Sequence, residues 1–182
     1  SYNNILDIDA ACRLIQDFSE PTFAIMKHNN SCGLATRSNI TEAYVSALAC
    51  DPKSAFGGVL ISNREIDEVT ATEINTLFFE IILAPAYSVA ALDILKSKKN
   101  RILLRIKENP SYQMKMRSAL NGCLMQEDDR SIETRKEWKL ATEASLNEAQ
   151  MLDLEFGIKA VKHLKSNGIA LIKNKQLIGM GC

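Results

Sequence analysis

The sequence predicts an α/β fold with a mixed, mainly parallel sheet and helices on both of its faces. Two observations carry this prediction. Short apolar runs typical of buried strands alternate with segments whose apolar residues repeat at helical spacing. A strand followed by a helix and then by another strand needs a crossover connection, which makes the two strands parallel.

The first part of the chain, residues 1–108, contains the predicted core. A first helix has an apolar face that reaches Phe18, and it ends before Pro21. A second helix begins at Asn39, where Glu42 suggests a capping box, and ends before Pro52. The other expected elements are helices at 67–77 and 88–97 and strands at 23–26, 58–62, 79–83 and 101–106.

The pattern changes after Asn109-Pro110, and we expect 109–182 to be an extension of the same domain. Two short strands, near Met114 and at 122–126, are predicted to lengthen the edge of the sheet.

A closing helix and hairpin complete this extension. The helix is expected to begin at Ser145, with Glu148 forming a second capping box, and to end near Lys165. A hairpin then turns at Asn174-Lys175.

Composition narrows the class of protein. The chain has 182 residues, and because Lys plus Arg and Asp plus Glu both number 22, no basic field suggests a nucleic-acid partner. The five cysteines are widely spread without a paired metal spacing, which favours reduced thiols in a cytoplasm over a disulfide framework. No apolar run approaches about 18 residues, so neither a membrane span nor a signal peptide is predicted.

Residues 23–35, which read FAIMKHNNSCGLA, are the first candidate functional stretch. Lys27, His28, Asn29 and Asn30 follow an apolar strand directly, and Gly33 would let the backbone turn sharply. In an open α/β sheet, reactive groups collect beyond the carboxyl ends of the strands. A Lys-His pair here suggests catalysis, although a solvated basic loop would give the same spacing.

A second candidate stretch, residues 49–58, reads ACDPKSAFGG and precedes another apolar strand. Two glycines at this place allow the backbone to approach a ligand closely, and they are equally typical of a β-bulge.

Together, KHNNSCGLA and DPKSAFGG resemble the AICAR transformylase portion of the bifunctional purine biosynthesis (AICAR transformylase/IMP cyclohydrolase) family. Three further blocks fit the same family in the same order: SYNNILDIDAA, FFEIILAPAYSVAALDILKSKKN and VKHLKSNGIALIKNKQLIGMG. The resemblance covers essentially the whole chain. It implies a cytidine-deaminase-like, three-layer α/β/α fold.

The resemblance implies formyl transfer from 10-formyltetrahydrofolate, the co-substrate, to the 5-amino group of AICAR, giving FAICAR in IMP biosynthesis. This reaction needs a base for the amine proton and a cation near the developing oxyanion. His28 suits the base because an unperturbed imidazole has a pKa of about 6.5. Lys27 suits the cation, or the acid that protonates the departing nitrogen.

The same resemblance assigns three further site residues. Asn167 is expected to be the third catalytic residue, although on sequence alone it is a helix C-terminal residue that tolerates a left-handed turn. Gly57 and Glu80 are expected to bind the nucleotide, and their other interpretations are a turn glycine and a surface carboxylate. The residues that contact the folate are not assigned, and His163 is interpreted as structural.

The resemblance also sets expectations for the assembly. The intact enzyme is expected to be a cytoplasmic homodimer without metal, in which Lys27, His28 and Asn167 come from one subunit. The chain matches the first half of the transformylase portion and lacks the cyclohydrolase domain, so we expect it to be folded but catalytically silent alone. Ser31 replaces the proline usual before Cys-Gly in the family.

Two rival functions follow from the same fold. A zinc-dependent deaminase needs a His-x-Glu and a Pro-Cys-x-x-Cys motif, and the sequence has neither. A non-catalytic nucleotide-binding or assembly module stays open as the alternative.

Overall fold

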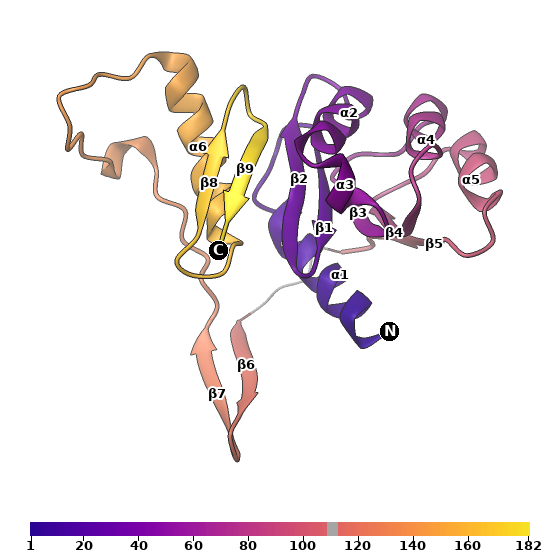
Figure 1. Ribbon diagram of the computed structural model, residues 1–182, viewed down its shortest axis with the longest axis horizontal. Helices are drawn as coiled ribbons and strands as arrows, with labels where there is room; N and C mark the ends of the chain where they lie inside the picture. Colours follow the sequence, from indigo (N-terminus) through magenta and orange to yellow (C-terminus); the bar gives the residue numbers. More distant parts are fainter. Residues whose placement is uncertain (109–112) are drawn as a thin grey trace.

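A five-stranded sheet forms the centre of the computed structural model, which describes residues 1–108 and 113–182 (Figure 1). The strand order is β2-β1-β3-β4-β5. Four strands run in one direction and β1 runs against them, which confirms a mixed, mainly parallel sheet. The strands are β1 (Thr22–Lys27), β2 (Asn30–Thr36), β3 (Gly58–Ser62), β4 (Phe79–Ala84) and β5 (Ile102–Arg105).

Helices cover both faces of this sheet, which confirms the three-layer α/β/α arrangement. Side chains alternate between the faces along each strand. Phe23 and Ile25 of β1 pack with α2, α4 and α5, whereas Ala24 and Met26 pack with α1 and α6. The helices are α1 (Tyr2–Ile15), α2 (Ile40–Cys50), α3 (Pro52–Ala55), α4 (Glu68–Ile74), α5 (Val89–Lys96), the short 3₁₀ turn η1 (Arg135–Glu137) and α6 (Glu148–Lys162).

Side-chain caps begin most of these helices. The Asn39 side chain accepts a hydrogen bond from the backbone N–H of Glu42 at 2.9 Å, as predicted. The Glu42 carboxylate, however, accepts from the Ser38 hydroxyl instead of returning to Asn39, so only half of the expected capping box forms. At α6 the capping box is made by Asn147 and Gln150, and the prediction of Ser145 with Glu148 was wrong.

The prediction of a turn at Gly33 was also wrong. The chain turns at His28 and Asn29, and Gly33 lies within β2. Gly33 is needed there for space, because a Cβ at this position would lie 2.2 Å from the carbonyl oxygen of Ala47 in α2. The glycine therefore lets α2 pack closely on β2.

The two short strands expected near Met114 and at 122–126 do not lengthen the central sheet. Strands β6 (Met114–Ala119) and β7 (Gly122–Glu127) pair with each other in a separate two-stranded sheet, which projects from the rest of the chain in Figure 1. Asp128 at its base bonds Arg13 of α1 at 2.7 Å. The Asn109-Pro110 boundary lies outside the described residues.

The expected closing hairpin is present as β8 (Ile169–Ile172) and β9 (Leu177–Gly181), with Asn174 and Lys175 both in the left-handed region. Helix α6 ends at Lys162, three residues before the predicted Lys165. Together α6 and this hairpin pack beside α1 and the β2 edge.

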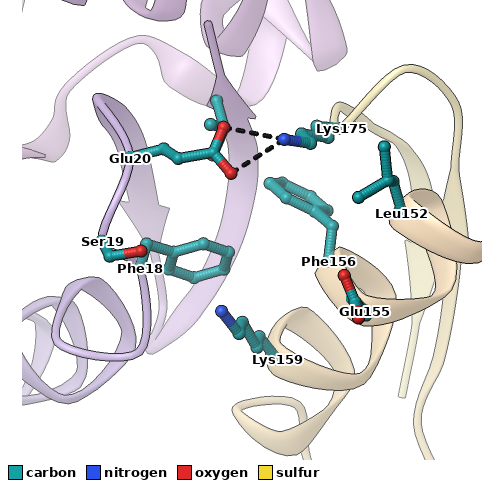
Figure 2. A pocket seen from close by; sticks show the side chains of 9 residues that line it. Phe18, Ser19, Glu20, Leu152, Glu155, Phe156, Lys159 and Lys175 are labelled. Carbon is teal, nitrogen blue, oxygen red and sulfur yellow. Dashed lines mark hydrogen bonds and ion pairs between the residues drawn. The ribbon is translucent and has the colours of Figure 1, made fainter. Parts of the chain in front are cut away.

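A small cavity of about 50 Å³ lies where this C-terminal unit contacts the core (Figure 2). The rings of Phe18 and Phe156 are 5.2 Å apart there, and Lys175 pairs with Glu20 at 2.7 Å. The cavity has room for a water molecule or two and is too small for a nucleotide. Substrate binding must therefore be sought elsewhere.

All five cysteines are free thiols in the structure. Burial raises the pKa of the Cys32 thiol to about 12, so it stays protonated and unreactive near neutral pH. In the described part of the chain, no helix is both long and apolar enough to cross a membrane.

Candidate active site

Three of the predicted site residues lie at the same end of neighbouring strands in the central sheet. Lys27 ends β1, Gly57 precedes β3, and Glu80 is the second residue of β4. Strand β1 is antiparallel to β3, with Met26 opposite Val59, and Gly58 lies opposite Phe79 of β4. The three positions therefore fall in one row across neighbouring strands.

The location of this row differs from the expected one. We expected the site beyond the carboxyl ends of the strands, and this holds only for β1. Because β1 runs against its neighbours, its carboxyl end meets the amino ends of β3 and β4. The usual rule for parallel sheets does not apply at a strand of opposite direction.

Lys27 and Gly57 are in direct proximity. The Lys27 ammonium donates a hydrogen bond to the carbonyl oxygen of Phe56 at 2.7 Å. A Cβ on Gly57 would lie 3.4 Å from the same ammonium, and Gly57 has a φ of +68°, which favours glycine. Its N–H donates to the carbonyl oxygen of Phe78 at 2.8 Å, which holds this loop on β4.

His28 is the first residue of the tight turn between β1 and β2. His28 and Asn29 have φ values of 53° and 64°, as in the two-residue turns that match the twist of a hairpin. The His28 side chain is exposed. The side-chain oxygens of Asn29 and Asn30 are buried, without a hydrogen-bond partner among the described residues.

Glu80 is held by α1. The register shift in the β3–β4 pair leaves Glu80 without a residue opposite it, as in a β-bulge. Its carboxylate accepts a hydrogen bond from the Asn4 side-chain amide at 2.9 Å. Asn4 was not predicted as a site residue, and neither was Asp7, whose carboxylate accepts from the Asn29 N–H at 2.6 Å.

Two exposed aromatic side chains adjoin Lys27. The rings of Phe56 and Phe78 are 4.9 Å apart, and each residue is at least half exposed. Phe78 also lines an open pocket of about 420 Å³, large enough for part of a small ligand. Its lining includes Lys98, Lys99 and Arg101.

Asn167, the remaining predicted catalytic residue, lies in the exposed turn between α6 and β8. At the end of α6, the His163 imidazole bonds the Asp17 carboxylate at 2.7 Å, just beyond the carboxyl end of α1. The part of Asn167 in the site therefore stays a prediction.

The Asp17 contact shows that His163 has the structural part expected of it. Burial raises the pKa of Asp17, but hydrogen bonds and charge interactions with His163 and Lys162 outweigh burial and leave that pKa below its usual value. Asp17 is therefore an ionised anchor between α1 and α6.

Titratable groups that could hold a metal ion do not cluster in the described residues: no group of three or more His, Cys, Asp or Glu side chains is found there. The chemistry available at the row is that of an ammonium, an imidazole, a carboxylate and backbone amides.

Fold and site together define a three-layer α/β protein. At one end of the strands in its sheet lie a Lys-His pair, a glycine that lets a ligand approach the backbone, and a carboxylate. Residues 1–182 match the AICARFT/IMPCHase bienzyme family, and the chain belongs to this family.

Curated relatives bear the name bifunctional purine biosynthesis protein PurH. The chain is 51% identical to the protein of Bacteroides thetaiotaomicron over 181 residues and 45% identical to that of Acetivibrio thermocellus over 185 residues. The protein of Lactococcus lactis subsp. cremoris is 43% identical. Each alignment covers 100% of this chain and 36% of the relative.

Proposed function

We propose that this chain carries part of the active site of an AICAR formyltransferase, which transfers the formyl group of 10-formyltetrahydrofolate to the 5-amino group of AICAR in purine biosynthesis. Family membership supports this proposal. The observation that carries it is the proximity of Lys27 to Gly57, with His28 and Glu80 at the same end of the sheet's strands. We propose the cytoplasm as its location.

Each residue has a definite part in this reaction. His28 accepts the proton of the aminoimidazole amine as the amine attacks the formyl carbon. Lys27 stabilises the negative charge that develops on the formyl oxygen, and later protonates the departing folate nitrogen. The Gly57 loop lets the nucleotide approach the backbone, and Glu80 accepts hydrogen bonds from it.

Asn167 is the third catalytic residue of this proposal. We propose a homodimer in which Lys27, His28 and Asn167 of one subunit act together at each site.

The test is a chimera in which this chain replaces the matching 36% of the Bacteroides thetaiotaomicron relative. We expect the chimera to release tetrahydrofolate when AICAR and 10-formyltetrahydrofolate are supplied together. A control chimera with Lys27→Ala and His28→Ala should be folded and inactive. A folded chimera without turnover would overturn the proposal.

The alternative is a non-catalytic nucleotide-binding or assembly module. The open pocket lined by Lys98, Lys99 and Arg101 is the observation that favours it. AICAR binding by the chimera without any formyl transfer would support this alternative.

A further inference from the structure

The turn that presents His28 has an unfavourable backbone. Both of its central residues are in the left-handed region, and neither is glycine. This region is uncommon for residues other than glycine, although Asn and His occupy it more often than most. Such a conformation persists only when surrounding contacts hold it. Those contacts therefore decide where the imidazole lies.

One side chain outside the hairpin holds this turn. The Asp7 carboxylate of α1 accepts the Asn29 N–H at 2.6 Å, a short, charge-assisted hydrogen bond. Strand pairing bounds the turn on its other side, with Lys27 opposite Asn30. Asp7 thus fixes the residue directly after His28.

The same face of α1 also holds the Glu80 carboxylate. Asn4 lies three residues before Asp7, so both side chains project from one side of the helix. Asn4 donates to Glu80 at 2.9 Å and is itself fixed by the Ser1 hydroxyl, which donates to the Asn4 side-chain oxygen at 2.9 Å. The first two turns of α1 therefore connect the His28 turn to β4.

We propose that Asp7 is a positioning residue for His28: it holds the β1–β2 turn in the left-handed conformation that presents the imidazole beside Lys27. This inference rests on the proposed function for the role of His28, but not for the geometry of the turn. Asn4 has the corresponding part for Glu80.

The chain contains a matched control for this role. The β8–β9 turn also has two left-handed residues, Asn174 and Lys175, and the Asp153 carboxylate of α6 accepts both of their N–H groups at 2.9 and 2.7 Å. Asp153→Ala removes the same kind of contact from a turn that has no proposed part in catalysis.

The first measurement uses the chain itself and does not require activity. Amide hydrogen exchange by NMR should show the Asn29 N–H exchanging at least about tenfold faster in Asp7→Ala, because its charged acceptor is lost. Asp7→Asn keeps an acceptor oxygen and should restore most of the protection. Unchanged exchange in Asp7→Ala would overturn the proposal.

The second measurement uses the chimera. Asp7→Ala should lower kcat about tenfold to a hundredfold with the KM for AICAR changed less than threefold, because a misplaced imidazole affects the transition state more than binding. Asp7→Asn should recover most of kcat, and Asp153→Ala should leave it unchanged. Equal losses of kcat in Asp7→Ala and Asp153→Ala would mean general destabilisation and overturn the assignment.

The two measurements separate the possible failures. An inactive parent chimera would count against the proposed function, while the Asn29 exchange would still decide whether Asp7 holds the turn. Faster exchange in Asp7→Ala with an undiminished kcat would refute the positioning role alone.

Discussion

The β1–β2 and β8–β9 hairpins use the same backbone device for different purposes. Each turns through two left-handed residues, and in each an aspartate of a neighbouring helix accepts backbone N–H groups of the turn: Asp7 accepts one and Asp153 accepts two. In the second turn, the carbonyl oxygen of Asn174 accepts a hydrogen bond from Arg37 at 2.8 Å, and Lys175 pairs with Glu20. The second turn therefore attaches one part of the molecule to another.

In the first turn the His28 side chain is exposed and available to a ligand. The side-chain oxygens of Asn29 and Asn30 are buried, without a hydrogen-bond partner among the described residues. The difference teaches that a strained turn is not by itself a functional sign. What distinguishes the first turn is that Asp7 fixes its backbone while the His28 side chain is exposed.

Replacing the first residue of each turn should give the largest difference in formyl transfer. His28→Asn keeps a residue that tolerates the left-handed region but removes the imidazole, so formyl transfer by the chimera should fall by about 10²–10⁴-fold. Asn174→Ala should change it less than about twofold. Release of tetrahydrofolate measures both. Near-normal turnover in His28→Asn would remove His28 from the mechanism.

Each hairpin also has a glycine in its second strand, and these differ in the space around them. A Cβ on Gly33 would meet backbone atoms of Ala47 at 2.2 and 3.0 Å, whereas one on Gly179 would meet the Leu171 side chain at 3.5 Å or more. Gly33→Ala should therefore cost about 3 kcal/mol of unfolding free energy, and Gly179→Ala under about 1 kcal/mol. Urea denaturation would show this, and equal costs would contradict it.

Replacing each of the two aspartates should lower the unfolding free energy, and the larger loss should come from the aspartate that matters less for catalysis. Asp153 accepts two backbone N–H groups and Asp7 only one. Asp153→Ala should lower the unfolding free energy by about 2 kcal/mol and Asp7→Ala by about 1 kcal/mol. Thermal unfolding monitored by circular dichroism gives both values. A larger cost for Asp7→Ala would mean that it does more than hold the turn.

The smallest expected effect concerns the contact of Asp17 with the end of α6, the helix before the second hairpin. The pKa of Asp17 is lowered in the folded protein, so its ionised form adds stability above the unfolded pKa of about 3.9, and this is lost as the pH falls through the folded pKa. Asp17→Asn should cost about 1 kcal/mol at pH 7 and nothing measurable once the pH lies well below the folded pKa of Asp17. A cost independent of pH would exclude this ionic contribution.

Local chemistry made part of the fold predictable. Asn39 caps its helix as expected, and the turn at Asn174-Lys175 was foreseen because Asn is a common turn residue between two apolar runs. Strand β2 was missed because Gly33 looked like the turn, when its real purpose is to admit α2. That purpose depends on a contact with Ala47, which sequence spacing does not reveal.

The candidate site divides in the same way. Lys27 and His28 were singled out because they follow an apolar strand, and the resemblance then assigned them together with Gly57 and Glu80. The structure places these four residues at one end of neighbouring strands. Asn4 and Asp7 were missed, although both lie in the SYNNILDIDAA block, because their hydrogen-bond partners lie far away in the sequence.

The contact between the second turn and β2 also affects solubility. β2 is an edge strand, and unpaired edge strands are templates for aggregation. The N–H of Thr36 donates to the carbonyl oxygen of Lys175 at 3.0 Å, and Ala35 forms a bridge with Gln176, so the end of this edge is already occupied. A chain shortened to exclude α6 and the second hairpin would leave these groups unpaired. Such a chain should form β-rich aggregates at concentrations where the full 182 residues remain dispersed.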